Sequence, residues 1–269
     1  MIRAVVAGAC GRMGAAIIGA LDSTEGIELS GAIERAGHPC FGEKGEVGET
    51  VGEGEILVVP DPVSLPAPFD VLIDFTTPEG TLENIGFCAD NHIPAVVGTT
   101  GLTGEQQEAM GVMASRVPVV FAPNMSVGVN LLFKLAATAA GVLGDSYNAE
   151  VVETHHRLKK DAPSGTAIRL AEAVAGARGR SLDRDAVYAR HGMIGERTRT
   201  EIGIQTLRAG DIVGEHTLLL AGPGERIELT HRAHNRDNFA RGAVRAAQWI
   251  IGKKPGLYSM GDVLGLTEV

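Results

Sequence analysis

Residues 2–14 read IRAVVAGACGRMG, a β-branched run that passes directly into a glycine-rich turn. An amphipathic helical pattern follows, with Ala16, Ile17, Ala20 and Leu21 on one side. Glycines in such a turn let the backbone approach a pyrophosphate, and the following helix N-terminus offers N–H groups with a partial positive charge. The stretch therefore predicts a strand, turn and helix that open a dinucleotide-binding α/β domain.

The spacing of this turn differs from the usual G-x-G-x-x-G, because Ala9 stands where its first glycine would fall. The surrounding pattern must therefore support the interpretation. A second strand is predicted over residues 27–33, and Glu34 follows it, twenty residues after Gly14, where an acid would bind ribose hydroxyls. Arg35 could bind a 2′-phosphate, which would allow NAD and NADP alike. An exposed Glu-Arg pair in a turn is the alternative.

Short apolar runs then alternate with helical stretches, after a polar, glycine-rich segment at 36–55. Strands are predicted at residues 56–59, 71–74, 95–97 and 117–121, and helices near 78–91 and 103–115, the second capped by Thr103. Polar or glycine-bearing loops follow three of the strands, at 74–78, 98–101 and 122–126. Ligands bind at the carboxyl ends of strands in open α/β sheets. The first half is therefore predicted to be a Rossmann-type domain with a mainly parallel sheet.

The pattern changes after Ser126. Residues 127–143 form a nearly uncharged helical stretch, expected to be buried on most sides between two domains. Further elements are predicted as a strand at 148–157, a helix at 166–177, strands at 198–207, 212–220 and 226–231, and helices at 237–252 and 258–266. The last three strands are expected to form an antiparallel meander. This half is predicted to be an α+β domain with a mainly antiparallel or mixed sheet, spanning 127–236, while 237–269 complete the first domain of 1–126.

Composition limits the function. The 269 residues carry a formal net charge of −9, which argues against a nucleic-acid or anionic-membrane partner. Cys10, Cys40 and Cys88 contain no Cys-x-x-Cys pair, so they are expected to be reduced thiols of a cytoplasmic protein, with no metal site. The N-terminus lacks the pattern of a signal peptide, and no segment is expected to be long enough to cross a bilayer.

Residues 153–166 read ETHHRLKKDAPSGT and crowd two imidazoles and two amines into six positions. In a strand His155 and His156 would point to opposite faces, so one of them could take part in the chemistry while the other has an orienting role. Ser164 is expected to cap a helix whose first N–H groups, at Gly165 and Thr166, would receive a carboxylate. The segment thus offers a proton donor beside an anion receptor. A solvated basic loop is the alternative. His231 and His234, with no cluster of carboxylates or cysteines to accompany them, are not predicted to bind metal.

The chain resembles the 4-hydroxy-tetrahydrodipicolinate reductase family, also called dihydrodipicolinate reductase, over essentially its whole length. The most specific signature is Glu153-x-His155-His156-Arg157-x-Lys159-x-Asp161-Ala162-Pro163-Ser164-Gly165-Thr166. Further motifs agree in order at 8–14, 98–101, 124–129, 231–233 and 239–240.

The resemblance implies roles for particular residues. His155 would be the catalytic proton donor or acceptor and Lys159 a second proton donor, while His156, Gly165 and Thr166 would hold the substrate. The implied cofactor contacts are Gly8, Ala9, Cys10, Gly11, Arg12, Met13, Glu34, Arg35, Gly98, Thr99, Thr100, Ala122, Pro123, Asn124, Met125, Arg236 and Phe239. Thr77 stands where relatives carry arginine. A homotetramer built through the sheets of the second domain is also implied.

The expected reaction is hydride transfer from NADH or NADPH to the ring of a cyclic unsaturated dicarboxylate, followed by protonation of the resulting enamine, in lysine and diaminopimelate biosynthesis. Two alternatives remain open at this point. One is a two-domain dehydrogenase acting on a sugar or semialdehyde, and the other is a non-catalytic dinucleotide sensor. The sequence does not decide between NADH and NADPH.

Overall fold

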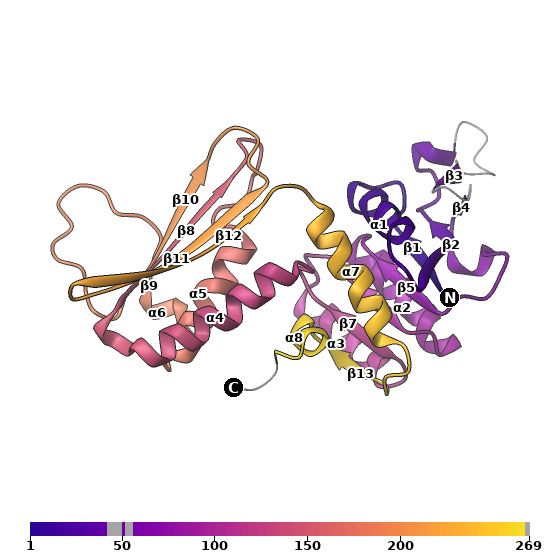
Figure 1. The fold of residues 1–269 in the computed structure, drawn as a ribbon. Coiled ribbons are helices and arrows are strands. Elements are labelled where there is room, and N and C mark those ends of the chain that lie inside the picture. Colours follow the sequence, from indigo (N-terminus) through magenta and orange to yellow (C-terminus); the bar gives the residue numbers. More distant parts are fainter. Residues whose placement is uncertain (42–49, 52–55, 267–269) are drawn as a thin grey trace. The chain divides into compact units, whose positions relative to one another are not determined.

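The computed structural model describes residues 1–41, 50–51 and 56–266 of the chain. It divides into two compact units (Figure 1). The first unit comprises Met1–Val127 with Arg236–Val269, and the second comprises Gly128–Asn235.

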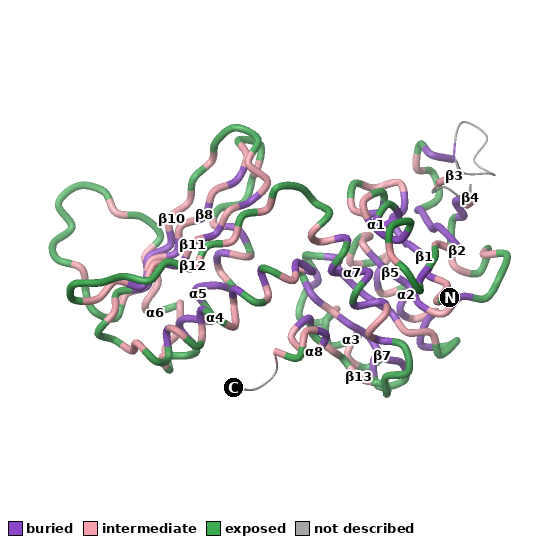
Figure 2. The backbone as a smooth tube through the Cα atoms, in the orientation of Figure 1, coloured by how far each residue is buried: buried purple, intermediate pink, exposed green. Residues whose placement is uncertain are grey.

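The first unit is built on one sheet with the strand order β13-β7-β6-β5-β1-β2-β4-β3. All its pairings are parallel except that of β3 with β4. The bounds are β1 Ile2–Ala7, β2 Ile27–Ile33, β3 Thr50–Val51, β4 Ile56–Val59, β5 Val71–Asp74, β6 Ala95–Val97, β7 Pro118–Phe121 and β13 Gly256–Tyr258. Central strands such as β5 are buried on both faces, as continuous apolar runs require (Figure 2). The predicted Rossmann-type fold class is confirmed.

Helices cover both faces of this sheet. The helices are α1 Arg12–Asp22, α2 Pro78–Asn91, α3 Gly104–Ala114, α7 Asp237–Ile250 and α8 Met260–Leu264. On one face α1, α7 and α8 pack against Ala4, Val6 and Ile73. On the other, α2 and α3 pack against strand residues such as Leu72 and Val97. Thr103 caps α3 through a reciprocal capping box with Gln106, as predicted. The predicted helix at 258–266 was wrong at its start, where β13 ends.

The second unit has a five-stranded mixed sheet in the order β12-β11-β8-β10-β9. Its strands are β8 Asn148–His155, β9 Ala186–Val187, β10 Ile202–Arg208, β11 Gly214–Gly222 and β12 Glu225–Ala233. The antiparallel pairing of β11 with β12 was expected, but the full meander is wrong, because β10 pairs in parallel with β8 and not with β11. The β10–β11 connection crosses the end of β8, where Ala209 donates to the carbonyl of His155 and Arg157 donates to that of Gly210.

Three helices complete the second unit: α4 Val127–Leu143, α5 Gly165–Ala177 and α6 Leu182–Asp185. Leu132 and Ala136 of α4 join the core under the sheet, whereas Leu135 and Val142 are exposed. The expectation of a helix buried on most sides was therefore wrong. The helical stretch Val127–Ser146, with mean hydropathy 1.6, is also long and apolar enough by composition to cross a membrane, contrary to expectation. Its apolar inner face packs against the core shared with α5, as a helix of a globular core does.

Candidate active site

The glycine turn after β1 is shaped by close backbone contacts. Gly8 has a φ of +77°, and a Cβ there would lie 2.5 Å from the carbonyl oxygen of Phe75. At Gly14 a Cβ would lie 2.2 Å from the carbonyl oxygen of Gly8, so α1 can begin directly against the turn. Gly11 is the N-cap of α1 and brings no side chain to cover the helix N-terminus. The turn is thus a cradle of the kind that receives a pyrophosphate.

A buried carboxylate holds the next two loops together. Asp74, fully buried at the end of β5, accepts hydrogen bonds from the hydroxyls of Thr81 (2.8 Å) and Thr99 (3.0 Å) and from the side-chain amide of Asn84 (2.7 Å). Its Oδ1 also accepts from the backbone N–H of Thr76 at 3.1 Å. The Thr99 side chain is therefore occupied inside the protein, so only the backbone at this position can face a cofactor.

Gly98 is the position in these loops where a side chain is least tolerable. A Cβ there would lie 2.1 Å from Cζ of the Phe75 ring. We expect Gly98→Ala to displace Phe75, to cost about 1–3 kcal/mol of unfolding free energy through overpacking, and to weaken dinucleotide binding. Urea unfolding and NADH titration of the purified variant would measure both effects.

Gly104→Ala is the matched control, since a Cβ at this first residue of α3 would meet nothing within 4 Å. It should leave NADH binding unchanged and be neutral or slightly stabilising. Equal stability of the two variants would contradict the packing argument.

Glu34 lies beside the glycine turn at the end of β2. Its side chain is 8% exposed, and Oε2 accepts the backbone N–H of Cys10 at 3.2 Å while Oε1 accepts that of Arg35 at 3.1 Å. The acid is therefore fixed against the turn, with lone pairs left on both oxygens for further donors. Arg35 itself is exposed. This arrangement fits an acid that binds ribose hydroxyls.

The remaining predicted cofactor residues differ in accessibility. Ala122 and Met125 are buried, so they can offer only backbone groups. Asn124 uses its Oδ1 to accept the N–H of Ser126 at 2.9 Å. The exposed members of the set are Arg12, Thr100, Pro123 and Arg236, and its partly exposed members are Cys10, Gly11, Met13, Asn124 and Phe239.

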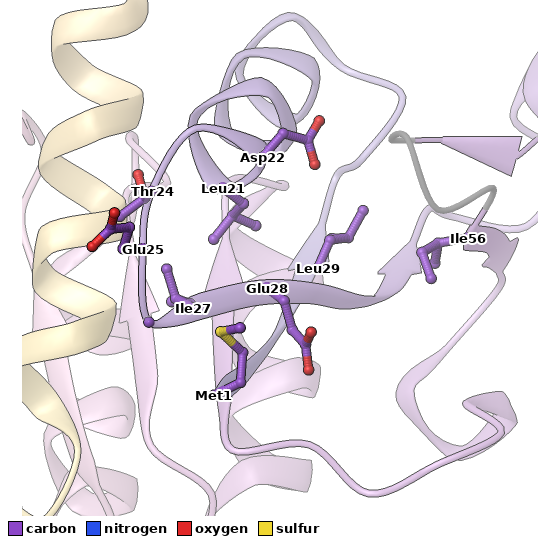
Figure 3. A pocket seen from close by; sticks show the side chains of 10 residues that line it. Met1, Leu21, Asp22, Thr24, Glu25, Ile27, Glu28, Leu29 and Ile56 are labelled. Atoms are coloured by element: carbon purple, nitrogen blue, oxygen red, sulfur yellow. The ribbon is translucent and has the colours of Figure 1, made fainter.

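A hollow in the first unit lies away from these residues. It has a volume of about 340 Å³ and is lined by residues that include Met1, Asp22, Glu25 and Glu28 (Figure 3). Its walls come from the amino ends of β1 and β2 and the loop before β2. Because open parallel sheets bind ligands at the carboxyl ends of their strands, this hollow is not the candidate dinucleotide site.

The second unit contains a polar cluster at the carboxyl end of β8. The fully buried carboxylate of Glu153 lies 2.6 Å from Nδ1 of His155 and accepts the backbone N–H of Ser164 at 2.9 Å. Arg208 donates to both carboxylate oxygens, at 2.8 and 3.0 Å. Burial alone would raise the pKa of Glu153, but hydrogen bonds from Arg208, His155 and Ser164 outweigh it and the pKa lies below its usual value. The carboxylate is therefore ionised.

Two neutral histidines lie next to this carboxylate. Burial lowers the pKa of His155, against the opposing effect of Glu153, and lowers that of His216 to about 3, helped by repulsion from His155. The two rings meet edge to face with centroids 5.1 Å apart. Since a carboxylate only accepts, His155 carries its proton on Nδ1 and presents an unprotonated Nε2. The hydrogen bond to Glu153 thus fixes the orientation of the His155 ring.

These depressed histidine pKa values predict acid sensitivity. In the unfolded chain His216 becomes protonated below about pH 6.5, whereas in the folded chain it stays neutral until the pH approaches 3. The contribution of His216 to the free energy of unfolding is therefore fully present above pH 6.5. It is lost as the pH falls, by up to about 1.4 kcal/mol per pH unit for this one proton.

We expect His216→Gln to reduce this slope by about one proton between pH 6 and pH 5, while His155 keeps part of it. Urea unfolding at several pH values gives the slope directly. If the unfolding free energy of the variant fell with pH as steeply as that of the parent chain, His216 would titrate normally in the folded state.

The other predicted residues of this segment lie around the cluster. Lys159 forms an ion pair with Asp161 at 2.9 Å, and its side chain is 21% exposed. Ser164 is the N-cap of α5 and accepts the N–H of Ala167, as predicted, so Gly165 and Thr166 begin the helix. His156 follows the last residue of β8 and has a buried Nδ1 without a hydrogen-bond partner among the described residues. Lys160 is exposed.

Sequence reasoning missed Arg208 and His216, which come from β10 and β11. His216 alternates with Leu218 and Leu220 along β11, so it faces the core side of the sheet next to β8. That alternation was a signal that His216 is buried. The contact of Arg208 with Glu153 depends on the parallel pairing of β10 with β8, which the predicted meander excluded.

Comparison with known proteins identifies the family. A family model described as dihydrodipicolinate reductase, N-terminus, matches residues 2–125, and one described as dihydrodipicolinate reductase, C-terminus, matches residues 128–264. The 4-hydroxy-tetrahydrodipicolinate reductase of Syntrophotalea carbinolica (strain DSM 2380 / NBRC 103641 / GraBd1) is 54% identical over 268 residues, covering 99% of this chain and 100% of that protein.

Two further relatives agree. The enzyme of the same name from Geotalea uraniireducens (strain Rf4) is 52% identical over 266 residues, with coverage of 99% and 100%. A solved structure, dipicolinate-bound dihydrodipicolinate reductase from Paenisporosarcina sp. TG-14, superposes with a TM-score of 0.77 at 27% identity, covering 96% of this chain and 97% of that one. The resemblance seen in residues 153–166 is thereby confirmed, and the chain belongs to the dihydrodipicolinate reductase family.

Proposed function

We propose that the chain reduces 4-hydroxy-tetrahydrodipicolinate to tetrahydrodipicolinate with NADH or NADPH, by hydride transfer to the ring and protonation of the resulting enamine. Family membership over the full length makes it an oxidoreductase of lysine biosynthesis. The observation that carries the proposed chemistry is the hydrogen bond between Glu153 and His155, close in sequence to the Lys159–Asp161 ion pair and the start of α5.

The first unit is proposed as the dinucleotide-binding domain. A bound nicotinamide cofactor would supply the hydride. The glycine turn at 8–14 would receive the pyrophosphate at the N-terminus of α1, because the N-cap Gly11 brings no side chain that would cover this helix end. Glu34 would bind ribose hydroxyls, and the exposed Arg35 would meet a 2′-phosphate when NADPH is bound. The loops at 98–100 and 122–125, with Arg236 and Phe239, would complete the contacts.

The second unit is proposed to bind the substrate and to handle protons. The N-terminus of α5 at Gly165 and Thr166 would receive one carboxylate, and His156 would contact the substrate. Lys159, whose amine forms an ion pair with Asp161, would be a proton donor. His155 is neutral in the free chain, so it would accept a proton, or donate one once the carboxylates of the substrate have raised its pKa.

Assembly and location follow the family resemblance. A homotetramer would form through the mixed sheet of the second unit, whose helices cover only one of its faces, and the chain would act in the cytoplasm. Light scattering of the purified protein would give four copies per particle if this is right, and a monomer at micromolar concentration would contradict it.

The activity is tested by supplying the condensation product of aspartate semialdehyde and pyruvate together with NADH or NADPH. Cofactor oxidation that depends on this product supports the reductase. Cofactor binding without turnover would instead favour a dinucleotide sensor, and turnover with a sugar or a semialdehyde alone would favour another dehydrogenase. Comparing kcat/KM for the two cofactors would test the role given to Arg35.

A further inference from the structure

Two thiols and an imidazole gather behind the glycine turn of the first unit. Cys10 belongs to the turn, whereas His38 and Cys40 follow β2, Cys40 within the short helical turn Pro39–Phe41. The two Sγ atoms and a ring nitrogen of His38 all lie within 4.8 Å of one another. Cys40 is 6% exposed, and the other two residues are partly exposed. The group is therefore sheltered but reachable from solvent.

The neighbours of His38 show which of its atoms meets the thiols. Its Nδ1 accepts the backbone N–H of Cys40 at 3.3 Å and lies 3.1 Å from Sγ of the same residue. A nitrogen that accepts an N–H carries no proton itself, so on metal binding the lone pair of Nδ1 would exchange this hydrogen bond for the ion. This is the protonation state in which histidine binds a metal ion.

We propose that Cys10, His38 and Cys40 bind one soft divalent metal ion, with Zn²⁺ as the reference ion. Two thiolates and one imidazole are a ligand set that zinc accepts, with water in the fourth position. Ligands at zinc-bond lengths of about 2.0–2.3 Å lie roughly 3.5–3.8 Å apart in a tetrahedron. The 3.1 Å separation of His38 Nδ1 from Cys40 Sγ would therefore lengthen slightly, while separations of up to 4.8 Å within the group would shorten. On binding, the two thiol protons pass to solvent and the two thiolates balance the charge of the ion.

Such an ion would tie the cofactor turn to the segment after β2. The backbone N–H of Cys10 already donates to Glu34, so one residue would connect the metal to the proposed ribose-binding acid. Metal binding and dinucleotide binding would then be linked, with equal effects of each on the affinity for the other. The site itself depends only on the three side chains and not on the proposed reaction.

The test uses the full-length chain, treated with a chelator and a thiol reductant and then dialysed anaerobically. Titration with Co²⁺ should give one equivalent of a tetrahedral complex, with visible d–d bands and near-ultraviolet thiolate-to-cobalt absorption, and Zn²⁺ should displace it. Zn²⁺ should also raise the melting temperature of the parent chain. Cys40→Ser and His38→Gln should each lose most of the thiolate absorption or weaken binding at least tenfold.

Cys88→Ala is the matched control, because Cys88 is fully buried in a different core cluster and should leave the spectrum unchanged. Circular dichroism of every variant separates loss of a ligand from loss of the fold. The proposal is overturned if the cobalt spectrum shows no thiolate ligation, or if the thiolate absorption persists in Cys40→Ser. It is also overturned if no metal binds under reducing conditions and Cys10 and Cys40 instead form a disulfide when the reductant is removed.

Discussion

Replacing Lys159 by methionine, or His155 by glutamine, should lower kcat about 10²–10⁴-fold, the range that general acid–base catalysis contributes. Both variants keep the approximate volume of the side chain while removing its proton chemistry. Since both residues belong to the second unit and the proposed cofactor residues to the first, the Kd for NADH should change by less than about twofold. Steady-state kinetics and NADH titration would separate the two effects.

Lys160→Met is the matched control for the lysine, because Lys160 is adjacent in sequence but exposed. It should retain the kcat of the parent chain. The exposed His234→Gln serves in the same way for the histidine. If Lys159→Met turned over normally, or if its whole defect lay in KM, the proposed role of Lys159 as proton donor would be wrong. A defect confined to KM would make the residue a substrate-binding cation only.

The first unit could be predicted closely from sequence because its signals are local. A buried parallel strand is a short apolar run ended by glycine or a polar residue, and β1, β5 and β6 all have this form. The alternation with helices then leaves few possible topologies. Glu34 could be placed beside the turn for the same reason, since parallel neighbouring strands end at the same edge of the sheet.

The errors concern contacts between residues distant in sequence. Short turns between 198 and 231 favoured a meander, but β8 lies between β10 and β11, and nothing local in the sequence specifies this pairing. The contact of Cys10 with His38 and Cys40 was likewise not foreseen, because it joins segments distant in sequence, and whether this group binds a metal is the proposal made above. Helix α4 was judged by its apolar composition, which does not reveal which of its faces is covered.

Of the substitutions that affect stability, Glu153→Gln should have the largest effect. The carboxylate of Glu153 accepts hydrogen bonds from His155, Ser164, Thr206 and Arg208. A glutamine keeps the shape but turns an NH₂ group toward donors, and it leaves the guanidinium of Arg208 without its counter-charge. Removing one partner of a buried ion pair costs about 3–5 kcal/mol. Because the Arg208 side chain is 19% exposed, water can compensate part of the loss, and we expect about 3 kcal/mol by urea unfolding at pH 7.

The control is Glu215→Gln, which removes the carboxylate that pairs with Arg232 in the same sheet. Those two side chains are 37% and 61% exposed, so the pair should contribute at most about 1 kcal/mol. A similar small loss for both variants would mean that Glu153 is not the electrostatic centre of the cluster. A large loss confined to Glu153→Gln would show that the carboxylate which orients His155 also stabilises the second unit. The ionised Glu153 would then serve stability and proton transfer through the same hydrogen bonds.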